Sequence, residues 1–194
     1  ELLKKNIQSR RKDFYAKTFD FKKTKTFIFN SLKDSIFPAW EGTKWDYNGV
    51  STVPQEGMIA CGYFVMTTLE HAGFKCDRVK FAQQASSKIV VSFSKKKDVK
   101  VFGNNDFASF YNYVSKFENE LFIVGLDNHV GFVVNDNGEL LAVHSTAWPQ
   151  REVVIEPLVK SKVFKDSKIF YTGKPLNSDE ILKKWRLGEE IKMI

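Results

Sequence analysis

A series of short strand-like segments in the second half of the chain constrains the fold more than any other feature. Residues 121–127, 129–135 and 139–145 read LFIVGLD, HVGFVVN and ELLAVHS, which are β-branched and aromatic runs separated by turn residues. The intervening tripeptide DNG, at 136–138, is a strong hairpin signal. EVVIEPL and SKIFYTG, farther along, are additional strand candidates. Together these segments predict an antiparallel sheet.

Helical patterns precede this sheet. Helices are expected over residues 24–40, 59–71, 78–89, 104–120 and 177–190. The first of these segments has helical periodicity over its whole length, but its helix should stop before Pro38. The second helix should end at Gly73, which would act as its C-cap. Residues 41–57 are rich in Gly, Asn, Ser and Pro and are expected to form a loop. Helices followed by an antiparallel sheet indicate an α+β fold. We expect a single domain over residues 1–194, with 1–20 as a peripheral helix or arm.

The charge and hydropathy of the chain restrict its partners. A net charge of +7, with a pI near 9.3, comes largely from lysines spread over the 194 residues. This pattern fits a solvated lysine-rich surface, which would favour anionic polymers such as bacterial walls, better than a nucleic-acid module, because no zinc-finger or RNP-type motif is present. No run approaches the roughly 18 to 20 apolar residues of a membrane span. The sequence lacks an initiator Met and a signal peptide, so we expect a processed or trimmed product whose leader could have been secretory.

The two cysteines, Cys61 and Cys76, are expected to be free thiols. A helix over 59–73 would hold them about 20 Å apart, whereas a disulfide needs Cα atoms within about 7 Å. The three histidines, His71, His129 and His144, do not lie at metal-binding spacings with the cysteines. We therefore expect no metal and no cofactor.

Cys61 lies where the helix over 59–71 should begin. A helix N-terminus lowers the pKa of a thiol and so favours the nucleophilic thiolate. The small residues Gly57 and Gly62 on either side would let a substrate backbone approach. Because free cysteine is also among the most buried residue types, a plain packing role is the alternative.

Hairpin parity places two histidines together. An Asn137–Gly138 turn would set His144 opposite Gly131, whereas a turn one residue earlier would set His144 opposite His129. Side chains on a strand alternate between faces, so both registers put His129 and His144 on one face. Such a pair could supply the base that a nucleophilic cysteine needs and the group that orients the base. The alternative is two ordinary polar side chains on a half-exposed sheet, and His71 is expected to be structural.

The motifs GTKWDYNG (42–49), IACGYFV (59–65), HVGFVV (129–134) and AVHS (142–145) resemble the NlpC-type cell-wall peptidases. The resemblance spans roughly residues 40–145. It implies a papain-like fold in which a helical N-terminal part, with the nucleophile at a helix N-terminus, packs on an antiparallel sheet. It further implies Cys61 as nucleophile, His129 as base and His144 as orienter. The chain departs from the family at Ala60, where an Asp usually precedes the cysteine, and this departure leaves the substrate open.

Secondary site residues follow from the same comparison. The papain group carries a Gln six residues before its cysteine as an oxyanion donor, and Gln55 occupies that position here. In NlpC-type enzymes an aromatic from the upstream loop lies at the site, which points to Trp45 or Tyr47. Asp127 would share the face of His129 on a regular strand and is a reserve orienter. Packing, turn and surface roles are the alternatives for these residues.

The implied function is a cysteine peptidase or amidase that hydrolyses peptide bonds in bacterial peptidoglycan through a thioester, with a D-γ-glutamyl–diamino-acid bond as the usual target. The partner would be a peptidoglycan peptide, with no nucleic acid and no membrane span, and we expect a monomer. A secreted, periplasmic or cell-envelope location would follow, although a cytoplasmic one stays open. The alternatives are a papain-like amidase, deamidase or acyltransferase acting on another substrate, and a non-catalytic module that binds the wall or nucleic acid.

Overall fold

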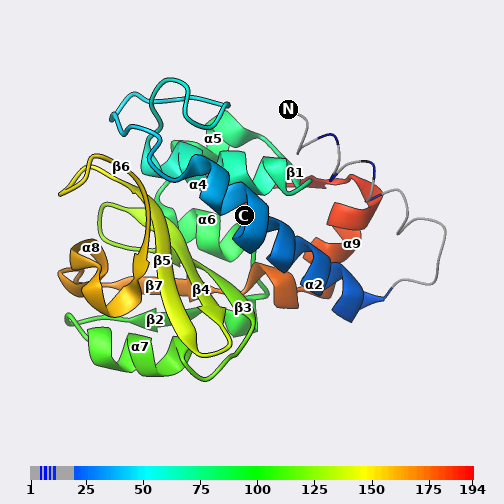
Figure 1. Cartoon of the computed structure of the whole chain (residues 1–194). Coiled ribbons are helices and arrows are strands. Elements are labelled where there is room, and N and C mark those ends of the chain that lie inside the picture. Colours follow the sequence, from blue (N-terminus) through cyan, green and yellow to red (C-terminus); the bar gives the residue numbers. More distant parts are fainter. Residues whose placement is uncertain (1–4, 6, 8, 10, 12–19) are drawn as a thin grey trace.

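A computed structural model describes residues 5, 7, 9, 11 and 20–194 of the chain. The peripheral helix or arm expected at residues 1–20 lies outside the described residues, apart from these scattered positions and residue 20. The remainder is an α+β structure, as predicted, with helices packed on both faces of an antiparallel sheet (Figure 1).

The main sheet has six strands in the order β2-β7-β3-β4-β5-β6, and every neighbouring pair is antiparallel. Its strands are β2 (Lys100–Phe102), β3 (Glu120–Gly125), β4 (Val130–Asp136), β5 (Glu139–Thr146), β6 (Glu152–Pro157) and β7 (Phe170–Gly173). The five expected strands are all present, and β2 is an additional edge strand. A separate two-stranded parallel sheet pairs β1 (Lys75–Cys76) with β8 (Glu190–Ile191).

The hairpin between β4 and β5 settles the register of the histidine strands. Asp136 pairs with Glu139, so Asn137 and Gly138 form a two-residue turn. Both turn residues have positive φ, 50° and 95°, as a type I′ turn requires. Because Phe132 pairs with Val143, the same register continues one step to bring Gly131 opposite His144. The first of the two expected registers is therefore the one that the chain adopts.

The longer helices are α2 (Phe21–Ser31), α4 (Cys61–His71), α6 (Ser86–Ser92), α7 (Phe107–Val114) and α9 (Asp179–Leu187). Shorter helical segments are η1 (Leu32–Ile36), α3 (Phe37–Trp40), α5 (Arg78–Ala82), η2 (Lys96–Asp98), η3 (Leu158–Lys160), α8 (Lys162–Lys165) and η4 (Pro175–Asn177). The Gly73 C-cap is confirmed by its φ of 92°, and Asp106 caps α7 by accepting from the Ser109 N–H.

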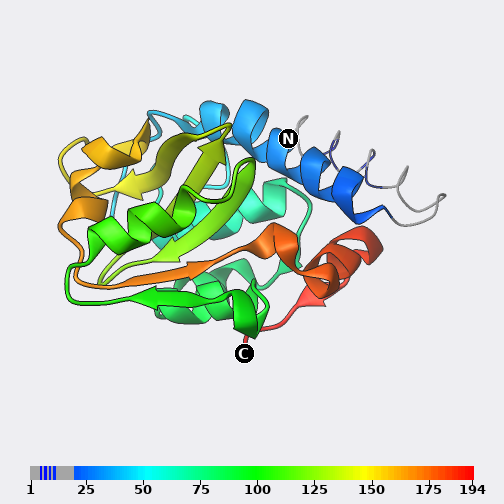
Figure 2. The ribbon, with the colours of Figure 1, turned by 90° about the horizontal axis from the view of Figure 1, so that it is seen from below.

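Two apolar cores lie on opposite faces of the sheet. Residues of α4 and α6, such as Phe64 and Ile89, pack with Phe132 on one face. On the other face, Phe110 of α7 and Phe164 of α8 share a cluster. Figure 2, seen from below, shows α7 on the sheet face opposite α4 and α6. This layering matters for the site because α4, which carries Cys61, and the two histidine strands meet at one end of the sheet.

Three expected helix boundaries are wrong. The first helix continues past Pro38 to Trp40, because the wide turn η1 precedes the proline and the Phe37 N–H bonds back to the Leu32 carbonyl. In such a wide turn the backbone N–H groups bond to carbonyls five residues back, so the i→i−4 hydrogen bond that a proline cannot make is not needed there. The expected helix over 78–89 divides into α5 and α6, where the Ser86 hydroxyl donates to the Leu126 carbonyl at 2.9 Å. The helix expected over 104–120 is confined to α7.

Candidate active site

Cys61 is the first residue of α4. The extended Ala60, with ψ of 159°, precedes it, so the helix begins two residues later than the sequence pattern indicated. The chain leading into Cys61 is held from two sides. Ser145 of β5 donates its hydroxyl to the Ile59 carbonyl at 2.6 Å, and the Ala60 N–H donates to Gly49 in the upstream loop at 2.9 Å. Strand and loop together therefore fix where the thiol lies.

Gly62 permits close packing behind the thiol. A Cβ atom on Gly62 would lie 2.4 Å from the Ala82 carbonyl oxygen, well inside van der Waals contact. The absence of a side chain thus lets the start of α4 lie against the end of α5. Only the side of Gly62 that a Cβ would occupy is filled by α5, and Gly62 also lines the pocket that contains Cys61, so its expected role in admitting a substrate backbone stays a prediction.

The two histidines form a direct contact. Nε2 of His129, the residue before β4, lies 3.0 Å from Nδ1 of His144 on β5. Their ring centroids are 5.0 Å apart and the rings are nearly perpendicular, at 84°. His144 has no exposed surface, whereas His129 is half-buried at the edge of a pocket. The expectation that the two side chains share a face is confirmed.

Gly131 provides the space for His144. A Cβ atom on Gly131 would lie 2.8 Å from Cβ of His144. The glycine in the HVGFVV segment therefore helps to form the candidate site, although only the family motif distinguished it in the sequence. Its role is steric, because the directly opposed positions of an antiparallel pair bring their Cβ atoms close together.

Glu156 of β6 extends the histidine pair and was not predicted. Its Oε1 lies 3.1 Å from Nε2 of His144, the nitrogen that faces away from His129. Val154 pairs with His144 across β5 and β6, so Glu156, two residues farther along, points to the same face. The available signal was an acidic residue in the middle of the otherwise apolar stretch VVIEPL, on the same strand face as Val154.

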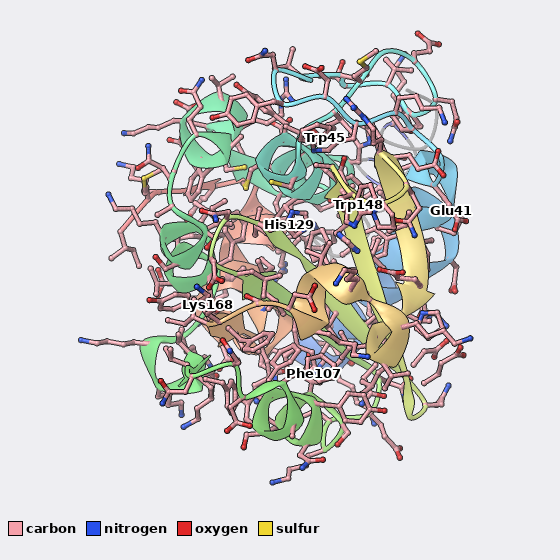
Figure 3. All side chains as sticks on the ribbon, turned by 90° about the vertical axis from the view of Figure 1, so that its left-hand side faces the viewer. Glu41, Trp45, Phe107, His129, Trp148 and Lys168 are labelled. Carbon is pink, nitrogen blue, oxygen red and sulfur yellow. The ribbon has the colours of Figure 1, made fainter. Side chains whose placement is uncertain are left out.

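A pocket of about 800 Å³ brings Cys61 and His129 together. Trp45 and Tyr47 of the upstream loop also line it, as expected. Figure 3 shows Trp45 and His129 on the same side of the molecule, with Trp148 beside them. Other parts of the wall carry uncharged polar groups, namely Asn48, Gln83, Gln84, Ser86 and Asn128. Asp127 is the one acidic residue among the described residues of this lining, so the opening beside the thiol is mostly uncharged and partly aromatic.

Gln55 does not line this pocket. Its side-chain amide donates to the carbonyls of Ala39 and Glu41, and its backbone has a positive φ of 64°. The expectation of an oxyanion donor at this position is corrected, because the amide holds the loop together instead. Backbone N–H groups of Cys61 and Gly62, at the start of α4, interact with the Cys61 thiol.

Asp127 lines the pocket, but its carboxylate accepts from the Lys168 backbone N–H at 2.9 Å. The nitrogen of His129 that an orienter would contact is already paired with His144. His71 lies at the far end of α4 and accepts from the Trp40 indole at 3.4 Å, which fits the expected structural role.

Burial shifts the pKa values of the Cys61 thiol and the His129 imidazole. Burial raises the pKa of the Cys61 thiol, and N–H groups of Val130, Gly62 and Cys61 oppose this rise. The pKa of His129 lies well below its ordinary value of 6.5, because burial and the neighbouring His144 disfavour its charged form. At neutral pH the pair is therefore a thiol and a neutral imidazole, which corrects the expectation of a low-pKa thiol. The free Cys76 is less acidic still, with a pKa raised to about 12, mainly by burial.

The described residues contain no group of three or more His, Cys, Asp or Glu side chains placed to hold a metal ion. Within the same part of the chain, no helix is both long and apolar enough to cross a membrane. Comparison with known proteins found no matching family model, curated protein or solved structure.

Proposed function

We propose that the chain is a papain-like cysteine hydrolase of NlpC type, which cleaves amide bonds in the stem peptides of bacterial peptidoglycan. The observation that carries the proposal is one pocket containing both Cys61, at the start of α4, and His129, whose far nitrogen contacts His144. A nucleophile, a base and an orienting group in this order are the elements that acyl transfer from an amide requires.

The proposed reaction begins with attack of the Cys61 sulfur on the amide carbonyl while the thiol proton moves to His129. A neutral pair suits this step, because the imidazole is free to accept the proton at neutral pH. Backbone N–H groups at the start of α4 would stabilise the tetrahedral oxyanion. His129 then protonates the leaving amine, and the C–N bond breaks to leave a thioester on Cys61.

Hydrolysis of the thioester completes the cycle. Water attacks the thioester carbonyl as His129 takes a proton from it, the C–S bond breaks, and the proton returns to the Cys61 sulfur. The products are a carboxylic acid and a free amine. Trp45 and Tyr47, at the mouth of the pocket, would contact the substrate near the scissile bond.

The substrate class rests on the family resemblance and on the net charge of +7, which favours an anionic polymer. A wall substrate would place the protein in the bacterial cell envelope or outside the cell. The D-γ-glutamyl–diamino-acid bond is the proposed point of cleavage.

The test is incubation of the protein with purified peptidoglycan, followed by mass spectrometry of the released fragments. Cleavage at the proposed bond leaves a new amine on the diamino acid and a new carboxyl on the glutamyl residue. Cys61→Ala should abolish release, whereas Cys76→Ala, the matched control on the other free thiol, should retain it. Acylation of Cys61 by simple peptide amides without release of wall fragments would favour the amidase or acyltransferase alternative.

A further inference from the structure

The Glu156 carboxylate contacts His144 on the side of the imidazole that faces away from His129. His144 is fully buried between two partners, with His129 at 3.0 Å from Nδ1 and Glu156 at 3.1 Å from Nε2. The ring of Phe164 packs against it, with centroids 5.5 Å apart, so water has no access to either nitrogen. A buried imidazole with a fixed partner on each nitrogen has its tautomer decided by those partners.

We propose that Glu156 is a positioning residue that sets the tautomers of both histidines, and thereby makes Nδ1 of His129 the base that faces Cys61. This inference deepens the proposed function and rests on it for its catalytic consequence, although the tautomers themselves can be measured without any substrate.

For a neutral His144, the assignment follows from the donors and acceptors on either side of its ring. The hydrogen bond from His144 holds the pKa of Glu156 below its ordinary value of 4.5, so the group is a carboxylate near neutral pH and can only accept. Nε2 of His144 must then carry the proton. A neutral His144 protonated at Nε2 has a lone pair on Nδ1, and it must accept from Nε2–H of His129.

The tautomer of His144 in turn determines which nitrogen of His129 is unprotonated. A neutral His129 with its proton on Nε2 has an unprotonated Nδ1, and this nitrogen is the one left available for the thiol in the shared pocket. The opposite set of tautomers would place a proton on Nδ1 of His129 and remove the base. Glu156 would therefore act on Cys61 through two imidazoles, without touching substrate.

The decisive experiment is nitrogen NMR of the full chain labelled with ¹⁵N-histidine at pH 7.5. The chain has only three histidines, so each imidazole can be assigned by single substitution, and His71 serves as the internal reference. We expect His129 and His144 to be neutral and protonated at Nε2. Protonation of His129 at Nδ1, or a doubly protonated His144, would overturn the proposal in the wild-type protein alone.

Variants of Glu156 test its causal role. In Glu156→Ala, the ¹⁵N shifts of His144 should move toward a mixture of tautomers, and those of His129 should follow. Glu156→Gln keeps an oxygen that can accept from Nε2–H, so its shifts and activity should lie between those of alanine and wild type. Glu139→Gln removes a carboxylate from an exposed position in the hairpin and serves as the matched control.

Activity provides the second readout. Glu156→Ala should lower kcat/KM by about 10- to 100-fold, mainly through kcat, which is the range known for loss of the hydrogen-bond partner of a metal-binding histidine. Unchanged tautomers and unchanged kcat/KM in this variant would refute the positioning role. If the alanine variant fails to fold, the glutamine variant and the wild-type spectrum still test whether Glu156 sets the histidine tautomers. Absence of wall cleavage by wild type would refute the proposed substrate but leave the tautomer result standing.

Discussion

Gly131 and His144 face each other across β4 and β5 so closely that any side chain on the glycine would meet the histidine. A Cβ atom at Gly131 would lie 2.8 Å from Cβ of His144 and 3.2 Å from the Val143 carbonyl oxygen. His144 has no free space to retreat into, because it is fully buried with Glu156 and Phe164 against it. The orientation of His144, which contacts His129, therefore depends on the lack of a side chain at Gly131.

Gly131→Ala should displace His144 and lower kcat/KM by at least tenfold. Overpacking of this kind also typically destabilises a protein by about 1–3 kcal/mol. Gly103→Ala is the matched control, because a Cβ atom there meets nothing within 4 Å and should change stability by less than about 0.5 kcal/mol. Urea titration and peptide hydrolysis check both variants. A Gly131→Ala protein with wild-type activity would show that the close approach is unimportant.

Cys61 should react with iodoacetamide faster than Cys76 near pH 7. Burial raises the pKa of both thiols, but that of Cys76 reaches about 12, and only Cys61 lies in a pocket with a base. The time course of adduct formation on each cysteine, followed by mass spectrometry of peptides, provides the measurement. Equal rates, or faster labelling of Cys76, would argue against Cys61 as nucleophile.

Replacement of His129 should lower kcat/KM more than replacement of His144. His129→Ala removes the proposed base and should lower kcat/KM by about 10²- to 10⁴-fold. His144→Asn or His144→Gln retains a hydrogen-bonding group and should keep much of the activity, while His144→Ala should lose more, though no more than His129→Ala. Circular dichroism checks folding in each case. Full activity in His144→Ala together with a crippled Asp127→Ala would assign the orienting role to Asp127 instead.

The acid limb of the pH–kcat/KM profile should lie well below pH 6.5. The proposed base is His129, and burial and the nearby His144 depress its pKa, so it stays neutral and competent in mildly acidic solution. Initial rates on one cleaved peptide, measured between pH 4.5 and 8, test this expectation. A limb centred at or above pH 6.5 would mean that a different group acts as the base.

The same depressed pKa predicts acid sensitivity of folding. The unfolded chain takes up a proton at His129 near pH 6.5, whereas the folded chain does so only at lower pH. The stability linked to His129 is therefore complete above pH 6.5 and is lost as pH falls through the folded pKa. Glu156, whose pKa is lowered chiefly by its hydrogen bond from His144, adds a similar loss only below about pH 4.5. Thermal melts should show a flatter decline of Tm between pH 6.5 and 5 in His129→Gln than in wild type; parallel curves would contradict this assignment.

Local signals in the sequence predicted much of the fold and the centre of the site. The strand runs, the Asn137–Gly138 turn and the Gly73 cap are determined by short-range chemistry, so they can be recognised from neighbouring residues. The parity of the hairpin was enough to place His129 and His144 on one face.

The missed features depend on contacts between distant segments. Glu156 reaches His144 from the neighbouring strand β6, whose register against β5 the sequence does not show, and nothing local distinguishes it from a surface acid. Gln55 lies six residues before Cys61, as an oxyanion donor would, but its side-chain amide donates to the carbonyls of Ala39 and Glu41 instead. The division between α5 and α6 likewise depends on a bond from Ser86 to Leu126, which lies 40 residues away.

Strand β5 carries His144 and Ser145 side by side, and the two side chains point to opposite faces of the sheet. One contacts the partner imidazole, while the other holds the Ile59 carbonyl just before Cys61. A slip of this strand by one position would exchange the two side chains, so that the thiol and the base would lose their support together. A misregistered strand should therefore remove the proposed activity altogether rather than change which amide bond the protein cleaves.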